Sequence, residues 1–521
     1  MSDPNNIGSD IISFYRGKSI FVTGGTGLMG KVLVEKLLRT CPGINKIYLL
    51  MRPKKGNDVN TRLSELINTR IFDGIRKTHP ETMSKLISVA GDITAPNLGL
   101  NSSDVKILTE NVSIVFHSAA TVKFDESLKE SVAMNMNGTK SVVQLCQKMK
   151  NLEALVHVST AYCNCDKEDI SEVIYPPPDD PEKIMKCVEC MDKELLENIT
   201  PQIIRSRPNT YTFTKALAEH IVLKEGVGLP VAIVRPSIVT AAWKEPLPGW
   251  IDNLNGPTGL LAGAGKGILR TLLCYRELIA DLIPVDIAIN LLVTVAWHTA
   301  QTRPDNVPVY NCTSGGLNPI RWMDVETWGH SSLTTLPFND VIWYPGGSFK
   351  SSKIINILCQ SFFHFIPAYL IDTVSVLIGR KPMMVRVQKK FKKAISVLEF
   401  FTTHEWKFHS TNVRNLLLKL NEHDRKLFNF DVKQVNWKKY IDNYVEGIRL
   451  YILKEDPESS HKAKINLRKM YVLHKMTQIL SLLFLIKILI GSKMEIVRKM
   501  WTSLWTISLY LARFISNSIR F

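Results

Sequence analysis

The stretch SIFVTGGTGLMG, residues 19–30, indicates a β-strand that turns through closely spaced glycines into the helix KVLVEKLLRT. In such a turn Gly24 permits a tight bend, Gly27 lets the backbone approach a pyrophosphate, and Gly30 lets the helix pack against the strand. The N–H groups that open the helix then face the anion. The stretch therefore predicts a dinucleotide-binding turn, with cofactor contacts expected from Thr23, Gly24, Gly25, Thr26, Gly27, Leu28 and Gly30.

Around this turn the chain alternates between apolar strand-like runs and longer amphipathic stretches, from residue 18 to about 240. The runs are KSIFVT, NKIYLLM, LISVAGD, SIVFHSAA, ALVHVST and VAIVRPS. This alternation is typical of the α/β class, and it predicts a Rossmann-type, doubly wound parallel sheet. The Pro- and Gly-rich residues 246–267 are expected to cap a pocket, and residues 320–350 to form a connector.

The charge of the chain is concentrated in its C-terminal part. Its 521 residues suggest two to three domains, and the formal net charge is +17. Residues 380–521 contain 28 Lys+Arg against 11 Asp+Glu, whereas the first 379 residues balance at 37 against 37. Because this basic part also holds long apolar runs and no nucleic-acid-binding motif, we expect membrane lipid as a partner and no nucleic acid.

Three apolar segments follow residue 350. Residues 354–379 contain His364, Pro367 and Asp372, which are costly at a bilayer centre, so a buried or interfacial hairpin and a spanning helix are equally open. Residues 380–455 are expected to form a small helical domain. Its basic beginning, GRKPMMVRVQKKFKK, fits either a solvated face or a contact with a membrane or an acidic ligand.

The last two apolar segments, residues 470–490 and 500–515, are predicted to anchor the chain in a membrane. The first has about the length that crosses a hydrocarbon core, and Trp501, Trp505 and Tyr510 are residues that favour membrane interfaces. The alternative is a helical pair docked on the body, or an oligomer contact. Basic residues flank both segments, so the charge pattern leaves the topology open.

The cysteines indicate a reducing compartment. There are nine of them, and the polar start MSDPNNIGSD is not a signal peptide, so we expect free thiols in the cytosol. Cys163-x-Cys165 and Cys187-x2-Cys190 lack a His partner at ligand spacing, so no metal is expected.

A second motif, Tyr211-Thr-Phe-Thr-Lys215, places a phenol and an ammonium on one face of a predicted helix. A nearby cation stabilises a phenolate and brings proton transfer by tyrosine into range. A hydroxyl that binds the substrate oxygen is expected at the end of a strand, where ALVHVST offers Thr160, with Ser159 as the alternative. His117 and His157 lie within strands and are expected to be core residues rather than bases.

Together these motifs resemble the extended short-chain dehydrogenase/reductase superfamily. The resemblance implies that Asp92 and Ile93 contact the adenine, and that Ala119 and Ala120 of the Ser118-Ala-Ala loop face the ribose and nicotinamide. Further implied positions are a helix motif that braces the sheet, with Asn135, Gly138 and Thr139, and Pro236 and Ser237 beside the nicotinamide.

The same resemblance favours NADPH as the cofactor. Arg52 closes the second strand where an NAD-preferring enzyme usually carries an acid for the ribose 2′-hydroxyl, and Lys54 and Lys55 follow closely. Cationic side chains at this position suit a 2′-phosphate.

Within the superfamily the chain resembles the alcohol-forming fatty acyl-CoA reductases. The similarity lies in VTGGTGLMGKVLVEKLLR, HVSTAYCN, YTFTKALAE and IVRPSIV, and in the C-terminal LEFFTTHEWKF and GIRLYILKE. It implies a reductase domain over residues 15–320 and the family's helical domain over 380–455. The implied reaction is NADPH-dependent reduction of long-chain or very-long-chain fatty acyl-CoA to a primary alcohol through an enzyme-bound aldehyde, with release of CoA.

Two other interpretations stay open. Another membrane-bound extended reductase, such as a hydroxysteroid dehydrogenase or a nucleotide-sugar epimerase, would share the turn and the Tyr-Lys pair but would not account for residues 385–455. A non-catalytic nucleotide-binding membrane scaffold would not require Thr160, Tyr211 and Lys215 together. An intracellular membrane is implied, and both the endoplasmic reticulum and the peroxisome fit.

Overall fold

The computed structural model describes residues 8–53, 56, 58–490 and 495–518, and its centre is a parallel sheet of seven strands. The strands are β1 (Ser19–Thr23), β2 (Lys46–Met51), β3 (Leu86–Ala90), β4 (Val112–His117), β5 (Ala154–Val158), β7 (Val231–Pro236) and β11 (Val309–Cys312). Their order is β11-β7-β5-β4-β1-β2-β3, the arrangement of a Rossmann fold. All six predicted strands are confirmed. The seventh, β11, has the sequence VYNC, which is too short and too polar to stand out as an apolar run.

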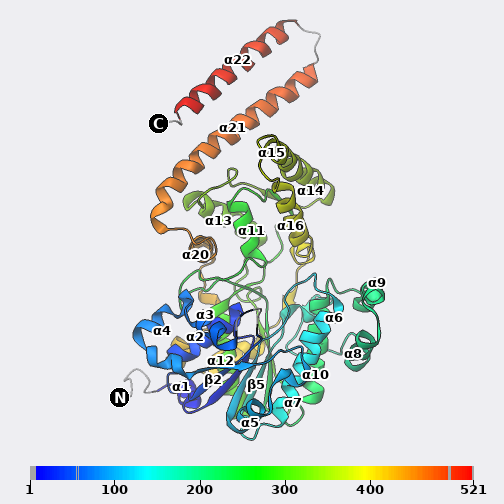
Figure 1. The fold of residues 1–521 in the computed structure, drawn as a ribbon, viewed down its shortest axis with the longest axis vertical. Helices are drawn as coiled ribbons and strands as arrows, with labels where there is room; N and C mark the ends of the chain where they lie inside the picture. The colour runs from blue at the N-terminus through cyan, green and yellow to red at the C-terminus, as the bar shows by residue number, and fades with distance from the viewer. Residues whose placement is uncertain (1–7, 54–55, 57, 491–494, 519–521) are drawn as a thin grey trace.

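Helices cover both faces of the sheet, as a doubly wound fold requires (Figure 1). Side chains of β1 alternate between the faces: Ile20 and Val22 pack in one core with α2 (Leu28–Thr40) and α12 (Val285–Thr302). Phe21 packs in the other core with α5 (Ser102–Asn111), α7 (Gly138–Gln147) and α10 (Thr210–Glu225). The carboxyl ends of the strands lie at an edge of the sheet, between these two helical layers.

The remaining elements of the first 350 residues surround this body. They are α1 (Asp10–Tyr15), α3 (Val59–Ile67), α4 (Asp73–Thr78), α6 (Leu128–Ser131), β6 (Asp169–Ile170), α8 (Pro181–Cys190), α9 (Lys193–Ile204), β8 (Ile238–Thr240), α11 (Pro257–Gly265), β9 (Thr271–Leu273), β10 (Leu282–Pro284), α13 (Trp322–Thr335) and β12 (Ser348–Lys350). The expectation of a plain connector over residues 320–350 is wrong, because α13 occupies much of it. Trp322, Val325 and Leu333 form the buried face of α13. Polar residues lie between them in the sequence, so the sequence did not indicate a helix here.

The C-terminal part is helical. It contains α14 (Lys353–Gln360), a π-helical turn η7 (Ser361–Phe365), α15 (Ile366–Leu377), α16 (Met384–Ser396), α17 (Glu399–Thr403), β13 (Lys407–Phe408), α18 (Thr411–Lys419), α19 (Glu422–Leu427), α20 (Trp437–Gly447), α21 (Ser460–Ile490) and α22 (Glu495–Ser518). Segments 470–490 and 500–515 lie in α21 and α22, which extend from one end of the molecule (Figure 1).

Segment 354–379 is not a hairpin in itself. Residues Lys353–Leu377 form one continuous helix, and the chain turns only after it, into α16. Of the helices that the structure describes, this one is long and apolar enough to cross a membrane.

The C-terminal helices share a core with the sheet domain. Tyr440 donates its hydroxyl to the carbonyl of Ala241 (2.7 Å), and the Tyr444 hydroxyl lies 2.6 Å from that of Thr258. At the end of α20 two glycines bring the backbones together: a Cβ on Gly447 would stand 1.7 Å from the carbonyl oxygen of Gly249. The division of the chain into domains at residues 320 and 380 stays a prediction, and the two predicted parts are closely packed against each other.

We therefore expect Gly447→Ala to weaken this junction. Overpacking of this kind costs about 1–3 kcal/mol, and thermal unfolding of the detergent-solubilised chain would show it as a lower Tm. Gly74→Ala is the matched control, since Gly74 lies in α4 and a Cβ added there would meet nothing within 4 Å. An unchanged Tm for Gly447→Ala would show that this backbone contact is loose.

Candidate active site

The glycine-rich turn has the geometry that its sequence predicts. Gly24 has a φ of +76°, and a Cβ there would stand 2.8 Å from the backbone nitrogen of Ala119. A Cβ on Gly30 would stand 2.2 Å from the carbonyl oxygen of Gly24, so the first turn of α2 lies directly against the loop. Gly27 is the N-cap of α2 and supplies no side-chain cap, which leaves the first N–H groups of the helix available to an anion.

Thr23 and His117 brace the turn from within the sheet. The Thr23 hydroxyl lies 2.7 Å from Nδ1 of His117 and accepts the backbone N–H of Ala119 at 3.2 Å. The other ring nitrogen of His117 lies 2.9 Å from the Thr139 hydroxyl. Because its hydroxyl is used in this way, Thr23 can serve a cofactor only through its backbone.

The two strand histidines are buried in the sheet, as the sequence indicated. Burial and the nearby charge of Lys215 lower the pKa of His117 to about 3, and the same causes hold the pKa of His157 well below its usual value. Both rings are neutral at physiological pH, so neither is a protonated acid beside the site.

Arg52, which follows β2, and Asp92, which lies after β3, are close together. The Arg52 side chain is 65% exposed, and its guanidinium lies 3.6 Å from the Asp92 carboxylate. Partial burial raises the pKa of Asp92, but hydrogen bonds from Thr94 and the charge of Arg52 outweigh it and hold that pKa below its ordinary value. Ile93 packs against Gly138 of the bracing helix. Lys54 and Lys55 lie outside the described residues.

Tyr211, Lys215 and Thr160 converge at the carboxyl end of β5. Lys215 is buried and donates its ammonium to the carbonyl oxygen of Val158 at 2.7 Å. Thr160 accepts the backbone N–H of Tyr162 at 3.3 Å, and its hydroxyl is within hydrogen-bonding reach of the Tyr211 phenol. The capping role and the candidate catalytic role of Thr160 therefore coexist, because a hydroxyl that accepts one bond can still donate another.

The electrostatics differ from the sequence-based expectation. Burial raises the pKa of Tyr211 to about 12, an effect that the hydrogen bond with Thr160 only reduces. Lys215 does not contribute the expected lowering of this pKa, and its ammonium donates to the Val158 carbonyl. Burial lowers the pKa of Lys215 itself to about 8, opposed by the charge of Glu219. In this arrangement Tyr211 keeps its proton and can donate it.

The other predicted residues line the same edge. Ala119 and Ala120 are half-buried in the loop after β4. Pro236 closes β7, and Ser237 donates its N–H to the carbonyl of Cys312 at 3.0 Å. Ser159 is buried one residue before Thr160, and its N–H bonds the carbonyl of Val234. Of the two strand-end hydroxyls, Thr160 is the one that meets Tyr211.

Sequence reasoning missed the aromatic rings over this site. The Phe124 ring lies 5.7 Å from that of Tyr211, and Phe401 of α17 lies 5.2 Å from Phe124. Tyr162 in turn contacts Phe401, Trp406 and Phe408. Three of these rings belong to LEFFTTHEWKF, so a stretch that carried only a family resemblance forms an apolar wall of the site.

A buried ion pair that the sequence did not indicate lies one turn beyond Lys215. Arg235 of β7 donates to both carboxylate oxygens of Glu219, at 2.8 and 2.6 Å, and both side chains are almost fully buried. The Cys163 thiol donates to the same carboxylate at 3.3 Å. The pair fixes α10 against the sheet, which holds Lys215 in place.

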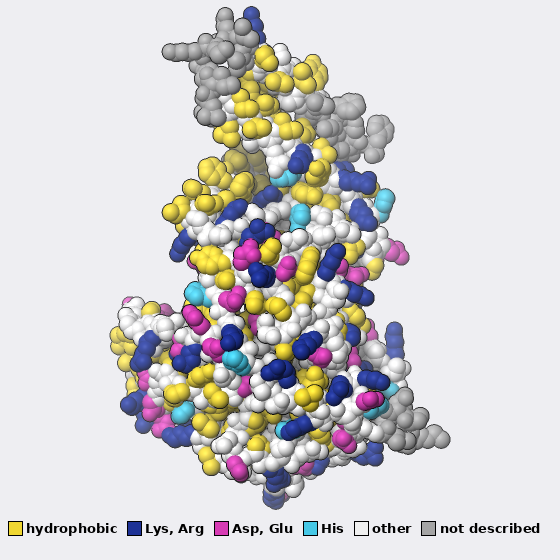
Figure 2. All heavy atoms as spheres, turned by 180° about the vertical axis from the view of Figure 1, so that it is seen from behind, with side chains coloured by type: hydrophobic (Ala, Val, Ile, Leu, Met, Phe, Trp, Pro, Cys, Tyr) yellow, Lys and Arg dark blue, Asp and Glu magenta, His cyan; other side chains and the backbone are white. Residues whose placement is uncertain are grey.

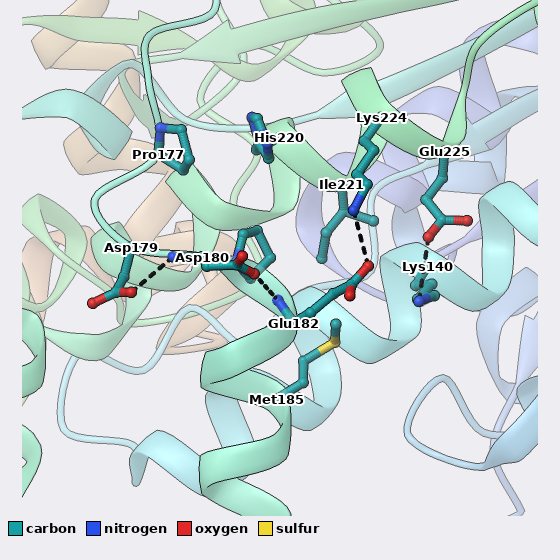
Figure 3. A pocket seen from close by; sticks show the side chains of 11 residues that line it. Lys140, Pro177, Asp179, Asp180, Glu182, Met185, His220, Ile221, Lys224 and Glu225 are labelled. Carbon is teal, nitrogen blue, oxygen red and sulfur yellow. Dashed lines mark hydrogen bonds and ion pairs between the residues drawn. The ribbon is translucent and has the colours of Figure 1, made fainter.

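A hollow of about 440 Å³ lies beside α10, and Figure 3 shows the side chains that line it. Its charged side chains pair with one another: Lys224 with Glu182 at 3.0 Å, and Lys140 with Glu225 at 3.2 Å. Lys224 follows Lys215 by nine residues, which is two and a half helical turns, so the two side chains point to opposite sides of α10. This hollow is therefore separate from the site at the strand ends.

Comparisons with known proteins match both parts of the chain. An NAD-binding family model described as male sterility protein matches residues 22–292, and a second model with the same description matches residues 363–455. Fatty acyl-CoA reductase 1 of Rattus norvegicus is 44% identical over 460 residues, covering 88% of this chain and 89% of that protein. Fatty acyl-CoA reductase 2 of Mus musculus is 41% identical over 493 residues, covering 95% and 96%.

Solved structures agree on the fold. The reductase domain of a nonribosomal peptide synthetase from Mycobacterium tuberculosis aligns with a TM-score of 0.55 at 18% identity, over 86% of this chain and 96% of that one. The terminal reductase domain of the myxalamid pathway aligns with a TM-score of 0.54 at 18% identity, over 85% and 92%. Fold and NAD-binding model together define a nicotinamide-nucleotide-dependent oxidoreductase of the extended short-chain dehydrogenase type. Within that class the chain belongs to the fatty acyl-CoA reductase family.

The buried ammonium of Lys215 generates a prediction on pH. Since its pKa is lowered to about 8, the fraction that is charged falls as the pH rises through that value. If the charge supports turnover, kcat/KM should decline above about pH 8. In Lys215→Arg, whose guanidinium stays charged, any remaining activity should lack this decline. A wild-type profile that is flat to pH 10 would show that the charge is not needed.

Proposed function

We propose that the chain reduces long-chain or very-long-chain fatty acyl-CoA to the primary alcohol with NADPH, in two steps at the site formed by Tyr211, Thr160 and Lys215. The meeting of the Tyr211 and Thr160 hydroxyls at the end of β5, where the buried Lys215 is bonded, carries the proposal, and the glycine-rich turn belongs to the same sheet. Bound NADPH would supply a hydride to the carbonyl carbon in each step.

The side chains have distinct roles in this proposal. Tyr211 and Thr160 donate hydrogen bonds to the substrate oxygen, which gains negative charge in the transition state. Tyr211, held protonated by burial, is the proton donor. After the first reduction the thiohemiacetal loses CoA as the thiol and leaves an aldehyde, and the same two hydroxyls bind the aldehyde oxygen for the second reduction.

The aromatic wall of Phe124 and Phe401 suits the substrate, because it gives an acyl chain an apolar surface next to the reacting carbon. No cysteine nucleophile is required. Burial raises the pKa of Cys163, the thiol nearest to the buried ion pair, so that it stays protonated.

The cofactor contacts are proposed along the edge of the sheet. The backbone of residues 23–28 and Gly30 would hold the pyrophosphate. Asp92 and Ile93 would contact the adenine, and Ala119, Ala120, Pro236 and Ser237 would line the nicotinamide half. Lys215 would bind the nicotinamide ribose, and Arg52 with Lys54 the 2′-phosphate.

The proposal extends to location. The apolar helices α21 and α22 would anchor the chain to an intracellular membrane, with the reductase body in the cytosol. This arrangement suits a substrate with a long acyl chain and a product that partitions into lipid.

The reaction and the role of Tyr211 can be tested together. Purified full-length protein is incubated with NADPH and acyl-CoAs of graded chain length, and NADPH loss and lipid product are both followed. We expect alcohol from wild type, and in Tyr211→Phe a loss of kcat of about 10²–10⁴, typical for a general acid, with NADPH binding retained. Tyr48→Phe, on β2, is the matched control. No NADPH oxidation with any acyl-CoA would refute the function, and full turnover by Tyr211→Phe would refute the assignment of the acid.

The cofactor preference has its own test. Removing one charge-assisted hydrogen bond costs about 1.5–3 kcal/mol, so Arg52→Ala should lower kcat/KM for NADPH by at least about tenfold and leave that for NADH unchanged. Lys46→Ala, at the opposite end of β2, should alter neither. Equal losses with both nucleotides would mean that Arg52 does not read the 2′-phosphate.

A further inference from the structure

The helix that runs through α14, η7 and α15 is polar on the side that faces the protein. Its inward side chains recur every four residues: Asn356, Gln360, His364, Ala368 and Asp372. Of these, Asn356, His364 and Ala368 are buried, and the other two are partly buried. This is the reverse of a surface helix of a water-soluble protein, whose apolar stripe faces the core.

Three of the four polar side chains of this stripe, those of Asn356, His364 and Asp372, have a partner on the protein. Asn356 accepts a hydrogen bond from the Thr271 hydroxyl at 2.9 Å, and His364 Nε2 accepts the backbone N–H of Arg270 at 2.9 Å. Asp372 accepts the backbone N–H groups of residues 383–385, at 2.8–2.9 Å, and so caps the start of α16. The polar residues that made this segment ambiguous in the sequence attach it to the body.

The outward side of the same helix is a continuous apolar surface. Its exposed residues are Ile354, Ile355, Ile357, Leu358, Phe362, Phe363, Ile366, Tyr369, Leu370, Ile371, Val374, Val376, Leu377 and Ile378. Figure 2 shows hydrophobic side chains gathered at this end of the molecule, which is also the end where α21 and α22 project (Figure 1). Water-soluble proteins rarely expose an apolar surface of this extent, so it requires a cover.

The segment that follows this helix in the chain carries many positive charges. Residues 380–393 contain seven Lys+Arg and no Asp or Glu. Gln388 fixes α16 to the body by donating to the carbonyl of Ile268 at 3.1 Å, and Lys389 and Lys390 beside it are exposed. An apolar surface bordered by cations matches a leaflet with anionic headgroups, where each nearby Lys or Arg adds to the attraction.

We propose that residues 354–378 lie in the plane of an anionic lipid leaflet, as a monotopic membrane surface distinct from α21 and α22. The outward apolar side chains enter the boundary between headgroups and acyl chains, and the basic residues from Arg380 to Lys390 contact the headgroups. The proposal concerns where the body sits on the lipid, and it does not depend on the reaction.

The bonded stripe argues against a spanning orientation. The helix has 25 residues, about 37 Å at 1.5 Å per residue, which would suffice to cross a bilayer. Its partners, however, lie along its whole length, from Thr271 opposite Asn356 to α16 opposite Asp372. A crossing helix would draw Arg270 and the basic α16 into the hydrocarbon core, which is strongly unfavourable.

Depth-dependent fluorescence quenching on the full-length chain tests the proposal. A fluorescent amino acid is introduced singly at Ile354, Phe362, Leu370 or Leu377, and at Leu418 of α18 as an exposed control away from this surface. The protein is reconstituted into phosphatidylcholine–phosphatidylserine vesicles that carry a spin label near the headgroup or near the chain end. We expect all four helix positions to be quenched several-fold more than Leu418, and each more strongly by the shallow label.

The other outcomes would overturn the proposal. Deep quenching at Phe362 and Leu370 with shallow quenching at Ile354 and Leu377 would indicate a spanning helix. Quenching no greater than at Leu418 would mean that a second copy or another protein covers the surface.

Charge reversal tests the headgroup contact. With the probe at Phe362, Lys389→Glu with Lys390→Glu should reduce quenching on phosphatidylserine vesicles, whereas Lys438→Glu with Lys439→Glu, an adjacent exposed pair on α20, should not. Equal quenching in both double variants would remove the electrostatic part of the proposal. NADPH binding, measured in parallel, identifies variants that have lost the fold.

Discussion

The contact between the first turn of α2 and the end of β1 is the constraint on which the site depends. No side-chain carbon fits at Gly24 or Gly30, because the backbone of the turn touches α2 on one side and the loop after β4 on the other. The same closeness lets Thr23 and His117 join these segments through the centre of the sheet. The glycine-rich turn is thus held by backbone contacts and buried hydroxyls, and its surface stays free for a nucleotide.

The C-terminal helices complete the reductase rather than following it. Phe401 reaches Phe124 beside Tyr211, and β13 pairs with β6 next to the strand-end loop. Tyr440 and Tyr444 hydrogen-bond to segments that follow β7. The parts that the two family models match, 22–292 and 363–455, therefore meet beside Tyr211, where the second part supplies the Phe401 ring.

The sequence sufficed where local chemistry decides the outcome. Six strands, the glycine turn and the helix of Tyr211 follow from patterns within about twenty residues. Contacts between distant segments could not be foreseen, so Phe124, Phe401 and the Arg235–Glu219 pair were missed. The state of Tyr211 also escaped prediction, because burial governs the pKa of the phenol and burial depends on the tertiary fold. Likewise, the sequence does not show whether the side chains of His364 and Asp372 face the protein or its surroundings.

One ion pair connects α16, which follows the proposed lipid-facing helix, with the loop beside Tyr211. Lys393, near the end of α16, lies 2.7 Å from Asp125, the residue after Phe124. The helix α16 therefore leads from the proposed leaflet to the ring beside Tyr211, and under that proposal the substrate would be met in two dimensions. The rate would then follow the number of acyl-CoA molecules per unit area of membrane. Adding empty lipid at constant bulk acyl-CoA would dilute the substrate and slow turnover, as it does for an interfacial enzyme.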